Sequence, residues 1–378
     1  MTMFHVKHPR TLLASVLLAS TLLVGCTGEL TPAKGWAPPV AGPNNTLLIQ
    51  SGAGRIAAIK TDGSPVASFE LKGAKTRDFI GRESQAAATP FYATPIVEGN
   101  TAYIVSYQGR VARLNLEGGS ITERWVVDLN HHVVATPVLR DNRLYVSTEN
   151  GRLAVVNVEN GSIVGETRPT PGRVWGSPAA ADDRVFIGTL DSSEILAVQA
   201  GNGSTLWRYD GDGATAADLV VDGSTLLVPS FDRAIHALDL ASGKESWAFP
   251  GDGWFVGKPL VTPGAIYAGT MSGSLYAIDR SGKQQWQFHR AGLEFRATPL
   301  LANGTLVGVS RNGTFVGLDA ATGAEKWSRT FEGVEIDANG LMLDNAIFFT
   351  THTYRLLRLD PATGEIQPVN VQPPSSGN

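Results

Sequence analysis

The feature that most constrains the fold of this chain is a pattern of about forty residues that recurs from Pro95 onward. Each copy starts with a segment such as Ala-Thr-Pro and ends in a stretch that usually contains tryptophan. Between them lie apolar stretches, a glycine turn and an Asp-x-x-x-Gly loop. A fixed period with four short strands per copy is typical of a β-propeller, in which each copy forms one blade. The copies align at Pro95, Pro137, Pro178, Asp218, Pro259, Pro299 and Gly340, with steps of 42, 41, 40, 41, 40 and 41 residues.

Residues 294–331 illustrate one copy. The innermost strand is expected at residues 296–302, and Asn303-Gly304 is a strong hairpin-turn signal. Two buried strands and an outer strand follow. In the loop before the outer strand, Asp319 is expected to accept backbone hydrogen bonds and Gly323 to take a positive φ.

Five of the eight tryptophans recur on the predicted outer strand. Large rings at a repeated position favour a packing role, so each is expected to fill the contact with an adjoining blade. These residues are Trp125, Trp207, Trp247, Trp286 and Trp327. The first copy is expected to use Phe69 there, and the third and last copies have Gly165 and Pro368 instead.

Counting the copies predicts an all-β chain, an eight-bladed β-propeller of four-stranded antiparallel blades over residues 38–371. A closed ring leaves only short, protected sheet edges. The first copy is the weakest, so seven blades are the alternative, but three strand-like segments between residues 45 and 71 favour eight. The blades are expected near 38–73, 90–129, 131–169, 172–211, 213–251, 253–290, 292–331 and 333–371.

The first 25 residues have the layout of an export signal, with Lys7 and Arg10 before an apolar run over residues 12–24. This run is shorter than the roughly 20 residues of a membrane-spanning helix. The run ends at Cys26, the one cysteine of the chain, in a segment that resembles a bacterial lipobox. The resemblance implies that Cys26 is acylated and anchors the protein to a membrane. An ordinary signal peptide is the alternative.

The segments that flank the predicted propeller lack hydrophobic periodicity. Residues 26–37 are expected to be the lipidated N-terminus and a tether, and residues 372–378 a disordered tail. Thr27 stands where an Asp commonly signals retention at the inner membrane. In a Gram-negative cell, analogy with other lipoproteins implies that the protein faces the periplasm from the outer membrane. In a single-membrane bacterium we expect it on the outer face of the cell membrane.

The repeats resemble PQQ-like, or quinoprotein-type, propeller repeats over residues 38–371. The close copies are residues 274–279 with Trp286 and residues 234–239 with Trp247. Two kinds of relative share this repeat, the quinoprotein dehydrogenases and the BamB lipoproteins of outer-membrane protein assembly. Resemblance to BamB implies a non-catalytic scaffold with a protein partner, the outer-membrane barrel-assembly complex.

Resemblance to the dehydrogenases implies a quinone held over Ca²⁺, with an Asp base and a pair of adjacent cysteines. A single cysteine excludes that pair. Motifs for a serine hydrolase, a P-loop or a zinc protease are also missing from the sequence. His131 and His132 are adjacent, so on a strand they point in opposite directions. We therefore expect no catalytic residue, no metal, and neither PQQ nor Ca²⁺.

The charge balance bears on partners as well. The chain has a formal net charge of −4 and no run of Lys or Arg, so the electrostatic signature of nucleic-acid binding is missing.

Residues just before each predicted inner strand are expected to ring one mouth of the central channel. Unlike the blade cores, these positions differ from copy to copy, and departures from a repeat are where function can lie. Tryptophan and arginine are residue types that anchor interfaces. The alternative is that these loops vary because nothing constrains them. The candidates are Tyr92, His132, Arg173, Trp175, Trp254, Glu294, Arg296 and Asp337.

Residues 73–88 form an unusually long connection after the first copy, and such loops are often functional. Lys75, Arg77 and Arg82 make it basic in an acidic protein, so it is a second candidate for a partner contact, with a plain linker as the alternative. A BamB-like scaffold is the leading functional hypothesis. The alternatives are a ligand-binding or sensory propeller of a single-membrane bacterium and a degenerate PQQ-dependent quinoprotein.

Overall fold

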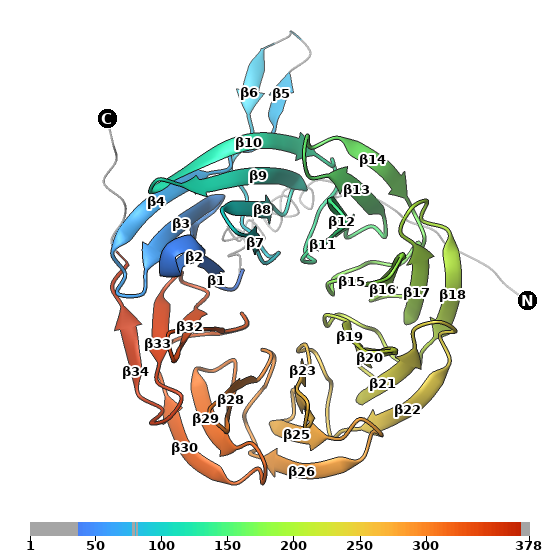
Figure 1. The fold of residues 1–378 in the computed structure, drawn as a ribbon, viewed down its shortest axis with the longest axis vertical. Helices are drawn as coiled ribbons and strands as arrows, with labels where there is room; N and C mark the ends of the chain where they lie inside the picture. Colours follow the sequence, from blue (N-terminus) through green and yellow to red (C-terminus); the bar gives the residue numbers. More distant parts are fainter. Residues whose placement is uncertain (1–36, 78–79, 81, 372–378) are drawn as a thin grey trace, which may run out of the picture. The chain divides into compact units, whose positions relative to one another are not determined.

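The computed structural model describes residues 37–77, 80 and 82–371. The predicted signal, Cys26, most of the predicted tether and the predicted tail lie outside these residues. The described residues form eight four-stranded antiparallel sheets arranged around a ring (Figure 1), which confirms the eight-bladed propeller. A short 3₁₀ helix, η1 (Pro43–Asn45), and a two-stranded hairpin complete the regular elements.

Each blade uses four consecutive strands, the first nearest the centre of the ring and the last at its outer rim (Figure 1). Blade 1 consists of β1 (Val40–Gly42), β2 (Thr46–Gly52), β3 (Arg55–Lys60) and β4 (Pro65–Glu70), and blade 2 of β7 (Ile96–Glu98), β8 (Thr101–Val105), β9 (Arg110–Glu117) and β10 (Ser120–Asp128). Blade 3 consists of β11 (Val138–Arg140), β12 (Arg143–Ser147), β13 (Leu153–Asn157) and β14 (Ile163–Thr167), and blade 4 of β15 (Ala179–Ala181), β16 (Arg184–Gly188), β17 (Glu194–Gln199) and β18 (Thr205–Asp210).

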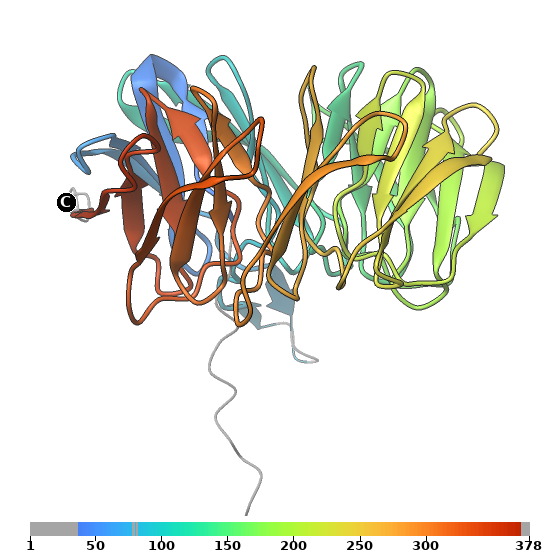
Figure 2. The ribbon, with the colours of Figure 1, turned by 90° about the horizontal axis from the view of Figure 1, so that it is seen from below.

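Blades 5 to 8 follow the same order, and in the side view the strands run between the two faces of the ring (Figure 2). Blade 5 consists of β19 (Val220–Asp222), β20 (Thr225–Pro229), β21 (Ala234–Asp239) and β22 (Glu245–Pro250), and blade 6 of β23 (Leu260–Val261), β24 (Ile266–Gly269), β25 (Ser274–Ile278) and β26 (Gln284–His289). Blade 7 consists of β27 (Leu300–Ala302), β28 (Thr305–Val309), β29 (Thr314–Asp319) and β30 (Glu325–Thr330), and blade 8 of β31 (Leu341–Leu343), β32 (Ala346–Thr350), β33 (Leu356–Leu359) and β34 (Ile366–Val369).

The inner strands are shorter than the sequence predicts. In blade 7, β27 begins after Pro299 rather than at Arg296, because proline has no backbone N–H to give to a sheet. The residue before it, Thr298, instead donates its backbone N–H to Asn339 Oδ1 of the next blade at 2.7 Å. The Ala-Thr-Pro segment thus joins blades rather than extending a strand.

The predicted turns of blade 7 are confirmed. Asn303 and Gly304 have φ values of 46° and 75°, as a tight hairpin between right-twisted strands requires. Asp319 Oδ1 accepts hydrogen bonds from the backbone N–H groups of Ala321 and Thr322, and Gly323 has a φ of 73°.

The hydrophobic core is divided among the seams between blades. Side chains alternate across a strand, so in β2 Leu47 and Ile49 pack toward blade 8 while Leu48 packs toward blade 2. Within the described residues the buried apolar side chains form eight such clusters, one at each seam. Most middle strands are buried on both faces, which explains why their sequences are nearly continuous apolar runs. In β9 the half-buried Arg113 and Asn115 interrupt the run.

Five outer-strand tryptophans connect neighbouring blades in one way. The ring of Trp327 on β30 lies against Gly364 of blade 8, and its Nε1 donates a 3.0 Å hydrogen bond to the carbonyl oxygen of Pro361. We call the receiving loop, between the third and fourth strands of the next blade, a tryptophan socket. Trp125, Trp207, Trp247 and Trp286 fill the sockets at residues 158–161, 240–243, 280–282 and 320–323 in the same way.

The assignment of Phe69 to the tryptophan position of blade 1 is wrong. In blade 4, Trp207 pairs with the residue that precedes a β-bulge, and the same register in blade 1 places Ala67 opposite Ala58. Phe69 lies two residues further along the same face and packs into the core between blades 1 and 2. A bulge shifts the count by one residue, which periodicity alone does not reveal.

The outer strand of the last blade needs a similar correction. In blade 7, Trp327 pairs with Gly317, two residues before Asp319. The corresponding pair in blade 8 joins Arg358 to Gln367, so Gln367 rather than Pro368 takes the tryptophan position. The strand pair β33–β34 has no bulge, and its register therefore differs from that of the other blades.

Ring closure does not use strands shared between the two ends of the chain. Blade 1 and blade 8 each contain four strands of continuous sequence. Leu47 and Ile59 of blade 1 pack against Phe348 and Leu356 of blade 8, all with 1% exposure or less. The Thr350 hydroxyl also donates a hydrogen bond to the Ala37 carbonyl. The seam is therefore held by sheet packing.

Candidate functional site

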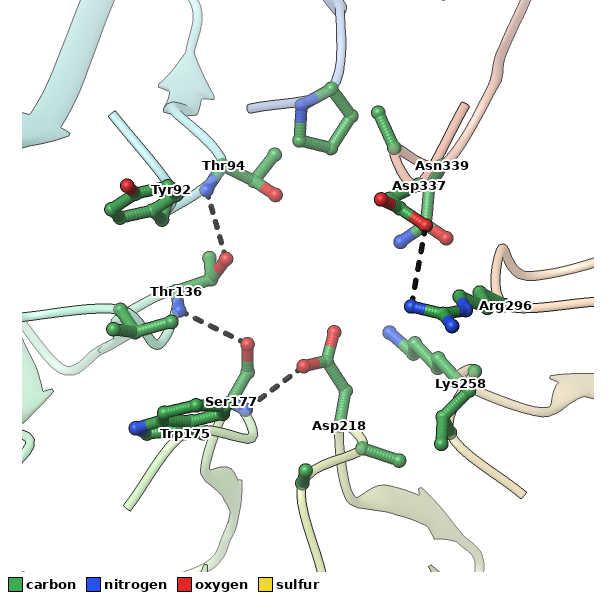
Figure 3. A pocket seen from close by; sticks show the side chains of 17 residues that line it. Tyr92, Thr94, Thr136, Trp175, Ser177, Asp218, Lys258, Arg296, Asp337 and Asn339 are labelled. Atoms are coloured by element: carbon green, nitrogen blue, oxygen red, sulfur yellow. Dashed lines mark hydrogen bonds and ion pairs between the residues drawn. The ribbon is translucent and has the colours of Figure 1, made fainter. Parts of the chain in front are cut away.

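The segments that precede the first strands line a central cavity (Figure 3). It has a volume of about 160 Å³ and receives residues from all eight blades. Four of the predicted residues, Tyr92, Trp175, Arg296 and Asp337, contribute to its wall. The cavity is the point at which candidate residues from distant parts of the sequence come together.

Hydrogen bonds along the wall of this cavity link blades 2 to 5 in series, and a further one links blades 7 and 8. In each link, the backbone N–H of the residue before the proline position donates to the side chain of the equivalent residue in the next blade. The links are Thr94 to Thr136 at 2.9 Å, Thr136 to Ser177 at 3.0 Å, Ser177 to Asp218 at 2.9 Å and Thr298 to Asn339 at 2.7 Å. The position before the proline therefore serves the architecture where its side chain is an acceptor, as at Thr136, Ser177, Asp218 and Asn339.

The alignment of Asp218 with the prolines is wrong by one residue. Asp218 accepts the hydrogen bond that Thr136 accepts in an earlier blade, so it occupies the Thr position and Leu219 the proline position. Consistently, β19 begins at Val220. The residue two places before Asp218, which lines the cavity, is therefore Ala216. Blade 5 has neither Thr nor Pro at these positions, so the sequence offered no marker for the register.

A second set of residues joins the predicted ones at the mouth. In blades 2 to 8, the carbonyl of the residue four places before the Thr position accepts a hydrogen bond from the backbone N–H of the second residue after the second strand of the same blade. This pairing places two variable side chains next to each other. The pairs are Pro90–Tyr107, His132–Glu149, Arg173–Leu190, Ala214–Phe231, Trp254–Met271, Glu294–Arg311 and Glu335–His352.

Sequence reasoning missed the second member of each pair, although a signal for it exists. In blades 2 to 8 a buried Ser or Thr directly follows the second strand, and its hydroxyl accepts a backbone N–H within or beside the turn that follows. These residues are Ser106, Thr148, Thr189, Ser230, Thr270, Ser310 and Thr351. The residue after the constant hydroxyl varies freely, just as the predicted mouth positions do.

Aromatic and polar side chains of blades 2 to 4 form one continuous group at the mouth. Tyr107 stacks on His132 with ring centroids 4.5 Å apart, and Tyr92 meets Tyr107 edge to face at 5.4 Å. Glu149 accepts hydrogen bonds from the Tyr107 hydroxyl at 3.4 Å and from Trp175 Nε1 at 3.1 Å. Burial, followed by the Glu149 carboxylate, raises the pKa of Tyr107, so this phenol remains a neutral donor.

Arg173 extends this aromatic group outward. Its guanidinium lies 5.6 Å from the centre of the Trp175 ring and forms a bidentate pair with Asp191 at 2.8 to 3.1 Å. Hydrogen bonding between the two groups raises the pKa of Arg173 and lowers that of Asp191, so both stay charged. The Trp175 side chain is thus held in a fixed orientation with 40% of its surface exposed.

Trp254 on blade 6 forms a separate aromatic platform. It stacks on Phe231 of blade 5 with ring centroids 5.2 Å apart and planes inclined by 14°. Trp254 is 49% exposed, so one face is packed and much of the ring remains open.

Charged side chains of blades 7 and 8 form an ionic network at the same mouth. Arg296 donates to Glu294 at 2.9 Å and lies 3.9 Å from Asp337. Asp337 also lies 3.5 Å from Arg311 and 2.8 Å from His352 Nε2. Burial acts to raise the pKa of Asp337, but the His352 hydrogen bond and the charges of His352, Arg296 and Arg311 outweigh it and lower that pKa.

The predicted basic insertion is a hairpin rather than an irregular loop. Its strands β5 (Lys75–Arg77) and β6 (Glu83–Gln85) pair antiparallel and project beyond the outer rim (Figure 1). The Lys75 and Arg82 side chains are exposed. The Arg77 side chain lies outside the described part of the structure.

The cavity does not match the donor set that a Ca²⁺-bound quinone requires. Asp218 and Asp337 line it from different blades, and each is already engaged, by Ser177 N–H and by His352. Among the described residues, no three His, Cys, Asp or Glu side chains are grouped so that they could hold a metal ion.

The predicted membrane attachment falls outside the part of the chain that the structure describes. Within the described ranges, no helix has the length and hydrophobicity needed to cross a bilayer.

Comparison with solved structures finds the same fold at low sequence identity. BamB from Moraxella catarrhalis matches with a TM-score of 0.63 and 18% identity over 84% of this chain and 92% of that one. The quinohemoprotein alcohol dehydrogenase from Comamonas testosteroni matches with 0.64 and 12%, over 89% and 74%. The computationally designed Ika8 protein matches with 0.63 and 13%, over 85% and 98%. No curated protein sequence matches the chain.

The family comparison is more specific than these fold matches. The model described as outer membrane protein assembly factor BamB matches residues 82–209, 191–298 and 291–375. These segments cover most of the propeller and fall on its repeats. The chain therefore belongs to the family described as outer membrane protein assembly factor BamB.

Proposed function

We propose that this protein is a non-catalytic scaffold that binds a protein partner at the channel mouth during the assembly of outer-membrane proteins. Family membership supports the general role. The observation that carries the proposed site is the exposure of Trp175 and Trp254, by 40% and 49%, at one mouth. The five repeated tryptophans pack between blades, whereas these two rings remain available to a partner.

The chemistry of the mouth suits a protein surface. Tryptophan and arginine are enriched among residues that dominate binding energies. Trp175 and Arg173 form one such group, and the network around Arg296 offers charges that can steer and orient a partner. Because both groups are held by hydrogen bonds before binding, little side-chain entropy remains to be lost.

We also propose that a lipid anchors the chain to a membrane and that the chain catalyses no reaction. Acylation of Cys26 would hold the propeller at a membrane, with residues 27–36 as the connection. Cys26→Ser should release the protein into the soluble fraction, and mass spectrometry of the N-terminal peptide should detect the lipid in the unaltered chain. We propose that neither PQQ nor Ca²⁺ binds, which titration of the purified chain with both would check.

Site-specific crosslinking in the native membrane tests the partner-binding surface. A photoreactive amino acid replaces Trp175 or Trp254, and mass spectrometry identifies the crosslinked protein. Val164 is a matched control, because it is 53% exposed on the outer strand β14, away from the mouth. The proposal expects a barrel-assembly protein at positions 175 and 254 and much less of it at 164.

Two results would contradict the proposal. Equal crosslinking at all three positions would remove the mouth as the binding surface. Recovery of a different envelope protein at positions 175 and 254 would keep the surface but replace the assembly role.

A further inference from the structure

The sockets for the outer-strand tryptophans differ in how they are filled. Five receive an indole from the preceding blade. At the socket of blade 4, Gly203 is covered by Thr167, and at that of blade 1, Gly63 is covered by Val369 and the Asn370 carbonyl. In blade 2, Gly118 and Gly119 have no described atom within 4 Å of the place that a Cβ would occupy.

The reason lies in the residue that faces this socket. Ala67 of β4 stands at the tryptophan position of blade 1 and is too small to reach across the seam. A cavity of about 400 Å³ results, within the range of small-molecule sites. Its apolar wall consists of Leu48, Ala58, Val66, Ala67, Leu116 and Ile121. Asn44, Lys60 and Ser120 add polar groups to the lining.

We propose that this cavity is a binding site for a tryptophan side chain presented by a partner polypeptide. The occupant is indicated by the chain itself, which fills five of its seven covered sockets with an indole. Leu116 follows Asn115 as Leu240 follows Asp239, and the Leu240 carbonyl accepts the Trp207 N–H. In blade 2, however, Leu116 lies within β9 and pairs with Ile121, so the loop of this socket is only the turn at Gly118 and Gly119. The apolar wall is therefore the part of the site that matches an indole. It is separate from the channel mouth and does not depend on the role proposed there.

Binding of N-acetyl-L-tryptophanamide to the purified chain tests this site. Saturation-transfer NMR should show transfer to the indole protons with a Kd on the order of 1 mM, as one buried aromatic side chain can provide. N-acetyl-L-alaninamide should show none. Ala67→Trp fills the cavity with the chain's own indole and should weaken probe binding at least tenfold, with an unchanged or raised Tm.

Gly165→Trp is the matched control. It introduces a tryptophan at the equivalent position of blade 3, where Thr167 already covers the next socket, and should leave probe binding unchanged. Ala67→Met, which fills the cavity with a flexible side chain, replaces Ala67→Trp if that variant does not fold. The proposal is overturned by a lack of transfer, or by equal transfer in the Ala67 variants. Binding of free indole but not of the amide would overturn the assignment to a polypeptide side chain.

Discussion

Asp337 is the residue on which the ionic side of the mouth depends. It is 17% exposed and faces Arg296, Arg311 and His352. Asp337→Asn should lower the free energy of unfolding by about 2 kcal/mol, because its three partners lose a shared carboxylate and keep only Glu294 or Glu335 as acidic contacts. Urea unfolding measures this. Glu335→Gln is the control: Glu335 contacts Arg311 but is 55% exposed, so its loss should cost about 1 kcal/mol or less.

The same carboxylate should give the protein a pH-dependent stability. Its pKa is lower in the folded chain than the ordinary value of 3.8. Its stabilising contribution is therefore fully present above pH 3.8 and is lost as pH falls through the folded pKa. The difference in unfolding free energy between the unaltered chain and Asp337→Asn should shrink below pH 3.8. A difference that stays constant from pH 6 to pH 3 would show that the Asp337 carboxylate is not the source of the pH dependence.

Ser177 tests the hydrogen bonds along the cavity wall. Ser177→Ala removes the acceptor of the Thr136 backbone N–H and should cost about 1 to 2 kcal/mol. Ser177→Thr keeps a hydroxyl, as Thr94 and Thr136 do at equivalent positions, and should be close to neutral. Equilibrium urea unfolding distinguishes the two through the midpoint at constant slope. Equal destabilisation by both variants would indicate a packing effect instead.

At the scale of elements, the joint between an outer strand and the next blade is the repeated unit of stability. Trp327 is 7% exposed, donates to the Pro361 carbonyl and covers Gly364. Trp327→Ala should cost about 3 to 5 kcal/mol. Trp327→Phe keeps an aromatic ring but loses the hydrogen bond, and should cost about 1 to 2 kcal/mol.

The free energies of unfolding of these two variants, measured by heat and by urea, should be compared with that of Trp254→Ala. Trp254 is 49% exposed at the mouth, and its removal should cost about 1 kcal/mol or less. A cost for Trp254→Ala equal to that for Trp327→Ala would mean that the mouth tryptophan is structural. The proposed partner surface would then lose its main support.

The strands themselves could be predicted more fully than their ends. Periodicity found the four strands of each blade, because buried strands need apolar runs and their turns need glycine or asparagine. It placed the start of β27 too early, since the Thr298 N–H bonds to another blade rather than within its own sheet. The hairpin of β5 and β6 was missed, because its polar sequence carries no alternation that distinguishes it from a linker.

For the whole molecule, closure of the ring depends on the seam between blades 8 and 1. Phe348 is fully buried there, and Phe348→Ala should cost about 3 to 5 kcal/mol. Each blade packs mainly against its neighbours, so the loss should stay local. Hydrogen exchange should rise in β2, β3, β32 and β33 while β16 to β21 remain protected. Equal loss of protection in all blades would show that the ring opens as one unit.

The sequence by itself determined the blade count, the loops that carry Asp and Gly, and the recurrent tryptophans. These follow from local chemistry repeated in register: apolar runs, glycine turns and one large ring per copy. It also located part of one mouth, because positions such as Trp175 and Arg296 depart from an otherwise regular pattern.

Only the tertiary structure decided which side chains meet. The pairing of His132 with Glu149, the network at Asp337 and the one-residue shift at Asp218 arise from contacts between segments far apart in the chain. The cavity beside Ala67 is a further case, since a small residue creates a site only when the facing loop leaves the space open. Local patterns specify a blade, but distances between blades arise only when the ring closes.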